Sequence, residues 1–175
     1  AAATDPEGES IIFSISGSEL QITSSGVITF DSAPDYETKS SYTASIFAND
    51  PDSVTKRQDI TVNVTDVNEA PAFTSSATFS AAENQTAIGT VAASDVDGDT
   101  LTYSISGSDI TINSSSGVIA FASAPDYETQ NSYTATVTVS DGSLSATQSI
   151  TVNVNDVNDA PSGTGAGYTL NLLPQ

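Results

Sequence analysis

The sequence contains no cysteine, methionine, tryptophan or histidine, and only three basic residues, Lys39, Lys56 and Arg57. Without cysteine no disulfide can stabilise the chain, and bound metal is one of the remaining ways to do so. The usual ligands of zinc, cysteine and histidine, are also missing. The scarcity of lysine and arginine argues against binding to nucleic acids or anionic membrane surfaces, both of which require clustered basic residues.

Acidic residues dominate the charge of the 175-residue chain. Twenty-two aspartates and glutamates give a formal net charge of −19, which leaves cationic partners such as metal ions or basic proteins. Strong acidity can indicate disorder, but runs rich in Val, Ile, Thr, Tyr and Phe favour strands. No apolar run reaches membrane-spanning length, and no signal peptide is recognisable. The sequence starts and stops within a repeating pattern, so we interpret it as an excerpt of a longer protein.

Two copies of one unit make up most of the sequence. The most specific repeated segment is a six-residue joint, Asp66–Pro71 (DVNEAP), which returns as Asp156–Pro161 (DVNDAP). Each joint follows a strand-like Thr-Val-Asn-Val and ends at a proline, which stops strand pairing. Other repeated pairs are Phe13–Gly17 with Tyr103–Gly107, and Ala33–Thr38 with Ala124–Thr129.

The second copy, residues 72–161, is complete, and its alternating pattern predicts seven short strands separated by turn signals. Seven strands in a unit of this size indicate an all-β fold of two packed sheets with Greek-key connections. We therefore predict tandem seven-stranded Greek-key β-sandwiches. The expected strands lie near 76–81, 86–93, 100–106, 109–113, 117–122, 132–140 and 144–155.

The first copy, residues 1–71, lacks counterparts of residues 72–90. We therefore expect an open sheet edge and an exposed flank of its core. Residues 162–175 begin a third copy, in which Tyr168, Leu170, Leu172 and Leu173 form the pattern of a first strand. This segment is either a frayed tail or a strand that fills the vacant edge of another molecule.

Acidic residues recur at fixed places in the repeat. Calcium requires about six to eight oxygen ligands from carboxylates, amides and backbone carbonyls, and several such clusters at loop ends would supply them. A single Asp-Gly pair is more often only a turn, and Asp-Tyr-Glu also fits a capped turn with its tyrosine in the core. The clusters are Glu83; Asp95-Val-Asp97-Gly-Asp99, echoed by Asp5-Pro-Glu7-Gly-Glu9; Asp35-Tyr-Glu37, echoed by Asp126-Tyr-Glu128; the two joints; and Asp50, echoed by Asp141.

Taken together, Ala-Glu-Asn, Asp-x-Asp-Gly, Asp-Tyr-Glu and Asp-x-Asn-Asp/Glu-x-Pro resemble the calcium motifs of cadherin repeats. The Ser/Thr/Ala-rich background without cysteine resembles the cadherin-like repeats of bacterial surface proteins. The resemblance covers nearly the whole chain and implies calcium held between successive repeats. The first copy lacks a counterpart of Glu83, so the number of ions at this junction stays open.

The resemblance also implies which residues bind calcium. From the upstream copy they are Asp35, Glu37, Asp66, Asn68 and Glu69, with backbone oxygens of Val67 and Ala70; from the downstream copy they are Asp95, Asp97 and Asp141. At the far end Glu83, Asp126, Glu128, Asp156, Asn158 and Asp159 would need a third repeat, so we expect that site to be weak or empty.

The leading hypothesis is an extracellular extender module that calcium stiffens, with adjacent repeats of the same chain as partners. The alternative is a calcium-dependent binding module for polysaccharide or for like repeats on another cell. We expect no nucleic-acid partner, no membrane insertion and no enzyme, although paired acids such as Asp35 and Glu37 resemble a glycosidase pair. Sugar sites usually expose aromatic rings, whereas we expect the strand aromatics to lie in the core: Phe13, Phe30, Phe47, Tyr103, Phe121 and Tyr133.

Overall fold

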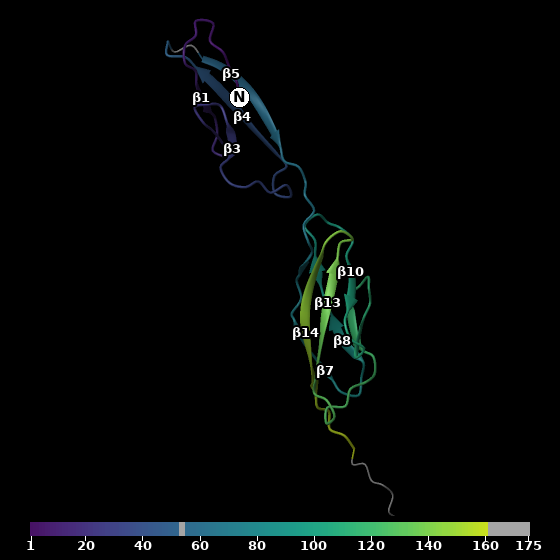
Figure 1. Cartoon of the computed structure of the whole chain (residues 1–175). Coiled ribbons are helices and arrows are strands. Elements are labelled where there is room, and N and C mark those ends of the chain that lie inside the picture. Colours follow the sequence, from purple (N-terminus) through teal and green to yellow (C-terminus); the bar gives the residue numbers. More distant parts are fainter. Residues whose placement is uncertain (53–54, 161–175) are drawn as a thin grey trace, which may run out of the picture. The chain divides into compact units, whose positions relative to one another are not determined.

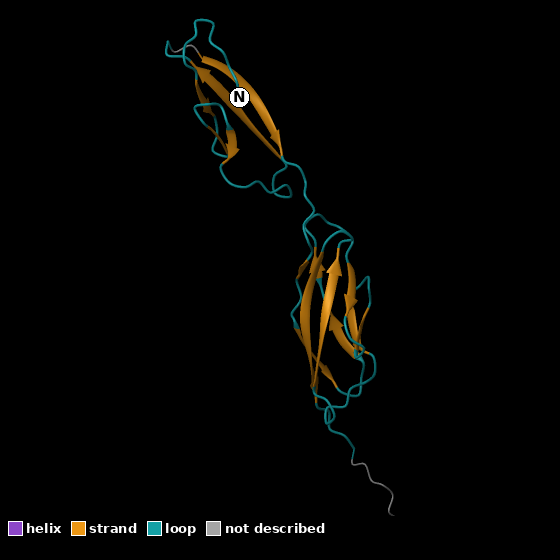
Figure 2. Ribbon diagram, in the orientation of Figure 1, coloured by secondary structure: helices purple, strands orange, loops and turns teal. Residues whose placement is uncertain are grey.

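The computed structural model describes residues 1–52 and 55–160. Contacts divide the chain into two compact units, unit 1 (Ala1–Glu69) and unit 2 (Ala70–Gln175). The described residues form strands and loops without a helix (Figure 2), as the alternating sequence pattern predicts. They therefore include no helix that could cross a membrane.

Unit 2 packs two sheets face to face, and a short strand pair lies beside them (Figure 1). The seven strands predicted for this copy are confirmed to within about two residues at most ends. Two further strands were missed because two residues are too few to show alternation. The first sheet has the order β10 (Thr102–Ile105), β13 (Ser132–Ser140), β14 (Ser145–Asn155) and β7 (Thr78–Ala82); the second has the order β11 (Ile110–Ile112), β12 (Val118–Phe121) and β8 (Ala87–Thr90); the short pair is β6 (Ala72–Phe73) with β9 (Ala93–Ser94).

The core of unit 2 lies between the two sheets. Alternation along β13 and β14 turns Val137, Val139, Ile150 and Val152 inward, where each is at most 1% exposed. From the second sheet Ile119 is 1% exposed. Because successive side chains of a strand point to opposite faces, the intervening threonines and serines face solvent.

The parallel pairing of β7 with β14 closes one side of this core. Thr78–Ala82 lie beside Thr151–Asn155 in register. Thr151 N donates a hydrogen bond to Ala77 O (2.9 Å), and Glu83 N donates one to Asn155 O (3.1 Å). Ala81 is 5% exposed, and Phe79 packs against the core from the same strand.

Unit 1 repeats the central part of this architecture with fewer strands. Its described residues contain no counterpart of β7 or β8, so one side of β5 carries no paired strand there, as the sequence predicts. The first sheet has the order β1 (Ile12–Ile15), β4 (Ser41–Asn49) and β5 (Thr55–Asn63), and the second pairs β2 (Leu20–Ile22) with β3 (Ile28–Phe30).

Unit 1 has a smaller buried core than unit 2 within the described residues. Among the described residues, eleven apolar side chains are buried in unit 2, whereas only Leu20 and Ile46 are buried in unit 1. Ile60, Val62 and Val64 are half-buried, although their counterparts in unit 2 belong to the fully covered core.

Two aromatic side chains of unit 1 depart from core positions: Tyr36, for which a core position was one of two open readings, and Phe47, which was expected in the core. Tyr36 is 38% exposed, whereas its counterpart Tyr127 packs against the core of unit 2 as expected. Phe47 lies opposite Arg57 and next to the buried Ile46, so strand alternation turns it to the outer face.

The unequal cores predict unequal costs for the same substitution at equivalent positions. Ile150→Ala should destabilise unit 2 by about 2–5 kcal/mol, because it removes fully buried atoms and leaves a cavity. Ile60→Ala should cost unit 1 clearly less, because that side chain already contacts solvent. Urea unfolding combined with hydrogen exchange resolves the two units. Equal losses at the two positions would contradict the difference in packing.

Candidate metal centres

Strand register places acidic segments at both ends of unit 2. β13 begins at Ser132, which pairs with Asn153, and ends at Ser140, which pairs with Thr102. The loop before β13 and the segment after β14 therefore meet at one end, called here the exit end. The loop before β10 and the turn after β13 meet at the other end, called the entrance end. Ala72 pairs with Ser94, so the chain enters unit 2 next to Asp95.

At the exit end a single buried carboxylate joins three segments. Glu83 follows β7 directly and is 3% exposed. Its Oε2 accepts a hydrogen bond from Tyr127 N (2.8 Å), and its Oε1 accepts one from Val157 N (2.7 Å). Burial of a carboxylate is costly unless it is hydrogen-bonded, and these two amides satisfy that requirement. Glu83 thereby positions the Asp-Tyr-Glu loop and the second joint.

Further carboxylates converge on Glu83. Ligand oxygens of Glu83, Asp126 and Glu128 lie within 4.8 Å of one another. A hydrogen bond from its own backbone lowers the pKa of Glu128, but desolvation and the charges of Glu83, Asp156 and Asp126 together raise that pKa above its ordinary value. The raised pKa reports mutual repulsion among negative charges that a cation would relieve.

Side-chain hydrogen bonds order the rest of the exit end. Asp126 caps its own loop, since Thr129 donates its backbone N–H to Oδ1 (3.1 Å) and its hydroxyl to Oδ2 (3.0 Å). Asn84 adopts a positive φ of 62°, and its amide donates to Asp159 Oδ1 (3.3 Å). In the joint, Asn158 Nδ2 donates to Asp159 O (3.3 Å). All six residues predicted for this site therefore belong to one end of unit 2.

The entrance end carries the second cluster. Ligand oxygens of Asp95, Asp97 and Asp99 lie within 4.8 Å of one another. Asp95 Oδ1 accepts hydrogen bonds from Asp97 N (3.0 Å) and Asp99 N (3.4 Å), a turn that Gly98 permits with a φ of 78°. Asp95 Oδ2 is buried and has no hydrogen-bond partner within the described residues. Such a buried acceptor requires an explanation, and a bound cation would provide one.

Asp141 follows β13 at the same end. Its Oδ1 accepts hydrogen bonds from Ser143 N and Leu144 N (both 2.6 Å), so it caps the turn into β14. The three-aspartate cluster includes Asp99 and omits Asp141. Asp99 was the residue that the sequence argument left out of the ligand set, although the Asp-x-Asp-Gly-Asp spacing already pointed to it.

Unit 1 reproduces these local structures. Asp5 Oδ1 accepts hydrogen bonds from Glu7 N (2.7 Å) and Glu9 N (3.3 Å), the same turn as at Asp95. Carboxylate oxygens of Asp5, Glu7 and Glu9 lie within 4.8 Å of one another. The sequence indicated only a weak counterpart of Asp95–Asp99 at this position. The hydrogen bonds to Asp5 show that its turn has the same backbone structure as the turn at Asp95.

The other end of unit 1 carries the first half of the proposed junction. Thr38 donates two hydrogen bonds to Asp35, one from its backbone amide and one from its hydroxyl. Both bonds lower the pKa of the Asp35 carboxyl, and the bond from the amide has the larger effect. A carboxylate oxygen of Glu37 lies within 4.8 Å of one of Asp66. In the joint, Asn68 Nδ2 donates to Glu69 O (3.1 Å), as Asn158 does in the second copy. Val67 is 68% exposed.

These clusters fit calcium by their chemistry. They offer carboxylate, amide and backbone oxygens, which is the donor set that calcium prefers. Asp95 Oδ2 is an unsatisfied buried acceptor within the described residues. A backbone hydrogen bond lowers the pKa of Glu128, but desolvation and then the neighbouring negative charges raise that pKa above its ordinary value. Neither fact requires a particular ion, but both favour a hard cation with several oxygen ligands.

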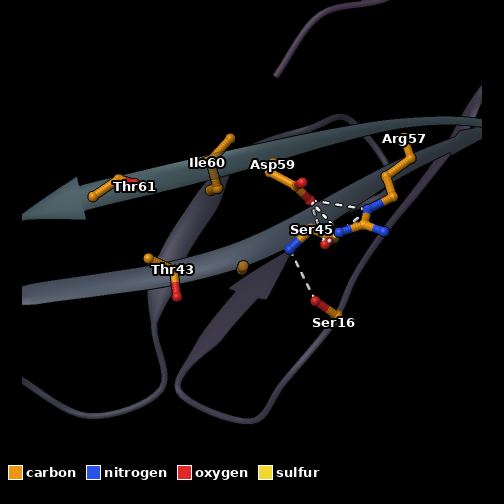
Figure 3. A pocket seen from close by; sticks show the side chains of 8 residues that line it. Ser16, Thr43, Ser45, Arg57, Asp59, Ile60 and Thr61 are labelled. Atoms are coloured by element: carbon orange, nitrogen blue, oxygen red, sulfur yellow. Dashed lines mark hydrogen bonds and ion pairs between the residues drawn. The ribbon is translucent and has the colours of Figure 1, made fainter.

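A hollow on the outer face of unit 1 offers no comparable site (Figure 3). Arg57 Nε donates to Asp59 Oδ1 (2.9 Å) and to Ser45 Oγ (3.1 Å), and Ser45 Oγ donates to Asp59 Oδ1 (2.6 Å). Ser45 N also donates to Ser16 Oγ (2.9 Å). These polar groups therefore form hydrogen bonds with one another. The hydrogen bond from Ser45 is the main cause that lowers the pKa of Asp59, and the hydrogen bond from Arg57 is the second.

The two hydrogen bonds of Glu83 predict its role without metal. Glu83→Ala leaves the amides of Tyr127 and Val157 without their acceptor, at about 1–3 kcal/mol each. We expect a loss of about 2–4 kcal/mol in the stability of unit 2 with a chelator present. Glu83→Gln, which keeps one acceptor oxygen, should lose less, and Glu128→Gln at the exposed rim should lose none. Urea unfolding measures all three, and native stability in Glu83→Ala would show that the buried carboxylate orders nothing.

Comparison with known proteins identifies the fold. The Cadherin domain family matches residues 77–155. Cadherin-99C of Drosophila melanogaster is 36% identical over 176 residues, which cover 90% of this chain and 10% of that protein. The solved protocadherin gammaB7 EC3-6 cis-dimer structure is 32% identical and superposes with a TM-score of 0.63 over 89% of this chain and 43% of that one.

A bacterial enzyme also contains a similar segment. Chitinase A of Pseudoalteromonas piscicida is 32% identical over 117 residues, which cover 60% of this chain and 14% of that protein. This chain thus spans only a small part of each curated relative. Cadherin domains in general are calcium-binding extracellular adhesion modules rather than catalytic ones. The chain therefore contains a cadherin-like domain, which the family match places at residues 77–155.

Proposed function

We propose that this chain is a spacer segment of an extracellular adhesin, in which calcium bound at the joint between repeats restricts bending. The observation that carries the proposal is the presence of ordered carboxylate clusters at both ends of unit 2. A protein with a single metal site would need a carboxylate cluster at only one end. A repeat within an array needs a cluster at each end, because it has a neighbour on each side. Unit 1 carries carboxylates at both of its ends as well.

The joint supplies the proposed connection. Asp66 follows β5 at the end of unit 1 that also holds Asp35 and Glu37, and the chain enters unit 2 beside Asp95. The short segment Val67–Pro71 is all that separates Asp66 from β6. The proposed ligands of this junction are Asp35, Glu37, Asp66, Asn68 and Glu69, backbone oxygens of Val67 and Ala70, and Asp95, Asp97 and Asp141. We add Asp99 to this set because one of its carboxylate oxygens lies within 4.8 Å of those of Asp95 and Asp97.

Electrostatics explains how stiffening would arise. Clustered carboxylates repel one another, and this repulsion is strong where solvent is partly excluded. Calcium, when bound, would supply a divalent charge and shared coordination to both sides of the joint. The residues of the chain contribute preformed turns: Asp95 and Asp5 hold their loops by the same hydrogen bonds. Extracellular calcium modules bind with dissociation constants of about 10⁻⁴–10⁻³ M.

The exit end is proposed as a second calcium site, which a following repeat would complete. Glu83 already fixes the loop and joint there by its two hydrogen bonds. The raised pKa of Glu128 shows that negative charges crowd this end before any neighbour approaches. We propose Glu83, Asp126, Glu128, Asp156, Asn158 and Asp159 as its ligands.

The alternative of a polysaccharide-binding module gains no specific support. Among the described residues, the most exposed aromatic side chain is Tyr36, at only 38%, and aromatic rings are the usual platforms for sugars. The polar groups of the hollow on unit 1 bind one another. The similarity to a chitinase concerns a part of that enzyme.

Calcium should stabilise the chain through Asp97. At calcium a hundredfold above the dissociation constant, binding adds about 2.7 kcal/mol. We expect Asp97→Asn to remove most of the calcium-dependent rise in melting temperature while leaving melting in chelator nearly unchanged. Asp109→Asn, which removes the same charge outside the clusters, is the matched control. An equal calcium shift in native protein and Asp97→Asn would refute the assignment of Asp97.

Small-angle scattering tests the spacer role itself. In chelator the joint should bend, and the distribution of interatomic distances should broaden. With millimolar calcium the native protein should give a single extended distribution. Asp97→Asn should keep the broad one, and Asp109→Asn should behave as the native protein does. Identical native curves in calcium and chelator would contradict stiffening even if calcium binds.

A further inference from the structure

Tension along the chain would act on unit 2 through its first and last strands. The chain enters through β6, next to Asp95 at the entrance end, and leaves after Asn155 at the exit end. β7 and β14 lie side by side in parallel, with Thr78–Ala82 beside Thr151–Asn155 (Figure 1). A pull on both flanks of the unit therefore draws these two strands along their own axes in opposite directions.

Parallel pairing turns this pull into shear. The hydrogen bonds between parallel strands run across the strand direction at a slant, so sliding one strand past the other strains all of them together. Two strands pulled apart from the same end would instead separate one bond at a time. The ladder is closed at both ends, since Thr151 N donates to Ala77 O (2.9 Å) and Glu83 N donates to Asn155 O (3.1 Å).

Core packing prevents a simple slip of the register. Phe79 packs against the core and Ala81 is 5% exposed, so both side chains occupy the inward face of β7. Because successive side chains of a strand point to opposite faces, a slip of one residue would turn both of them outward. β7 can therefore move past β14 only by leaving the core, and the loss of burial adds to the loss of hydrogen bonds.

The side chain of Glu83 extends the ladder beyond the end of β14. Its Oε1 accepts a hydrogen bond from Val157 N (2.7 Å), which lies past Asn155, and its Oε2 accepts one from Tyr127 N (2.8 Å). Hydrogen bonds to an ionised carboxylate are about twice as strong as neutral ones. Glu83 is 3% exposed, so water competes little for its oxygens. A chain pulled away at the exit end must break the bond to Val157 before the pull reaches β14.

We propose that β7, β14 and the Glu83 carboxylate form a shear clamp that resists tension along the chain without calcium, with Glu83 as its terminal rung. At the entrance end β6 pairs with β9 over only two residues, so that pair gives way before the clamp does. The clamp serves the protein only if the chain carries tension, and in this respect it rests on the proposed spacer function. The strand pattern at Tyr168–Leu173 lies outside the described residues, and the clamp involves none of it.

Optical tweezers that hold the whole chain by its two ends, in chelator, test the role of Glu83. Unit 2 has more residues in its fold than unit 1, so its unfolding releases more chain and can be identified. Glu83→Ala should speed the unfolding of unit 2 at constant force about 30-fold, because its hydrogen bonds are already broken when the clamp opens.

Val137→Ala is the matched control. It removes buried atoms from a fully buried position on β13, which is not a strand of the clamp. Both variants lower the stability of unit 2 in urea. The contacts of Val137 persist until the clamp has opened, so the rate of unfolding under force should change less than about threefold. Equal acceleration by the two variants, or none by Glu83→Ala, would overturn the role of Glu83 as the terminal rung.

The direction of pull tests the clamp itself, even if Glu83→Ala fails to fold. The native chain has no cysteine, so handles can be attached at chosen thiols. Handles on Thr78→Cys and Asn155→Cys shear β7 past β14, whereas handles on Thr78→Cys and Thr151→Cys peel the same two strands apart from one end. Shear should require a severalfold higher force than peeling.

Equal forces in the two directions would overturn the clamp. All of these measurements are made without calcium, so they test the clamp separately from the stiffening of the joint. A clamp that holds in chelator while scattering shows no stiffening would reject the proposed calcium role alone, and the reverse pair of results would reject the clamp alone.

Discussion

The parallel pairing of β7 with β14 is the interaction on which the rest of unit 2 depends. It closes the side of the sandwich where Val152 and Val154 would otherwise meet solvent. It also carries Glu83 to the exit end, where that carboxylate accepts hydrogen bonds from two other segments. Unit 1 shows the consequence of lacking this strand among its described residues: the equivalent valines are half-buried and Tyr36 is exposed.

Packing and charge are therefore coupled in this fold. The apolar positions of each strand build the sandwich, and the loops that connect the strands gather carboxylates at its ends. The whole chain carries a net charge of −19, so its carboxylates repel one another wherever they cluster. Carboxylates gather around Glu128 at the exit end, and Asp95 at the entrance end keeps a buried oxygen that has no hydrogen-bond partner within the described residues. In the proposed calcium-bound state, cations at these positions would reduce the repulsion between the carboxylates.

Sequence reasoning succeeded where the signal is local. Alternation along 132–140 and 144–155 identified the longest strands, and the recurrence of DVNEAP as DVNDAP identified the repeat. It failed for β6 and β9, which are too short to alternate, and for Phe47, whose outward position follows from register with Arg57. Asp99 was left out of the expected ligand set, although the Asp-x-Asp-Gly-Asp spacing pointed to it and its carboxylate lies close to those of Asp95 and Asp97.

The sequence by itself determined the fold class, the repeat and the acidic clusters, because strand periodicity and motif spacing are properties of neighbouring residues. Only the tertiary structure decided that Glu83 is buried and binds two distant amides, that Asp95 keeps one oxygen unsatisfied, and that Tyr36 and Tyr127 differ in burial despite identical surroundings in sequence. These outcomes depend on contacts between strands far apart in the chain, and identical local sequences acquire them only when the partner strand is present.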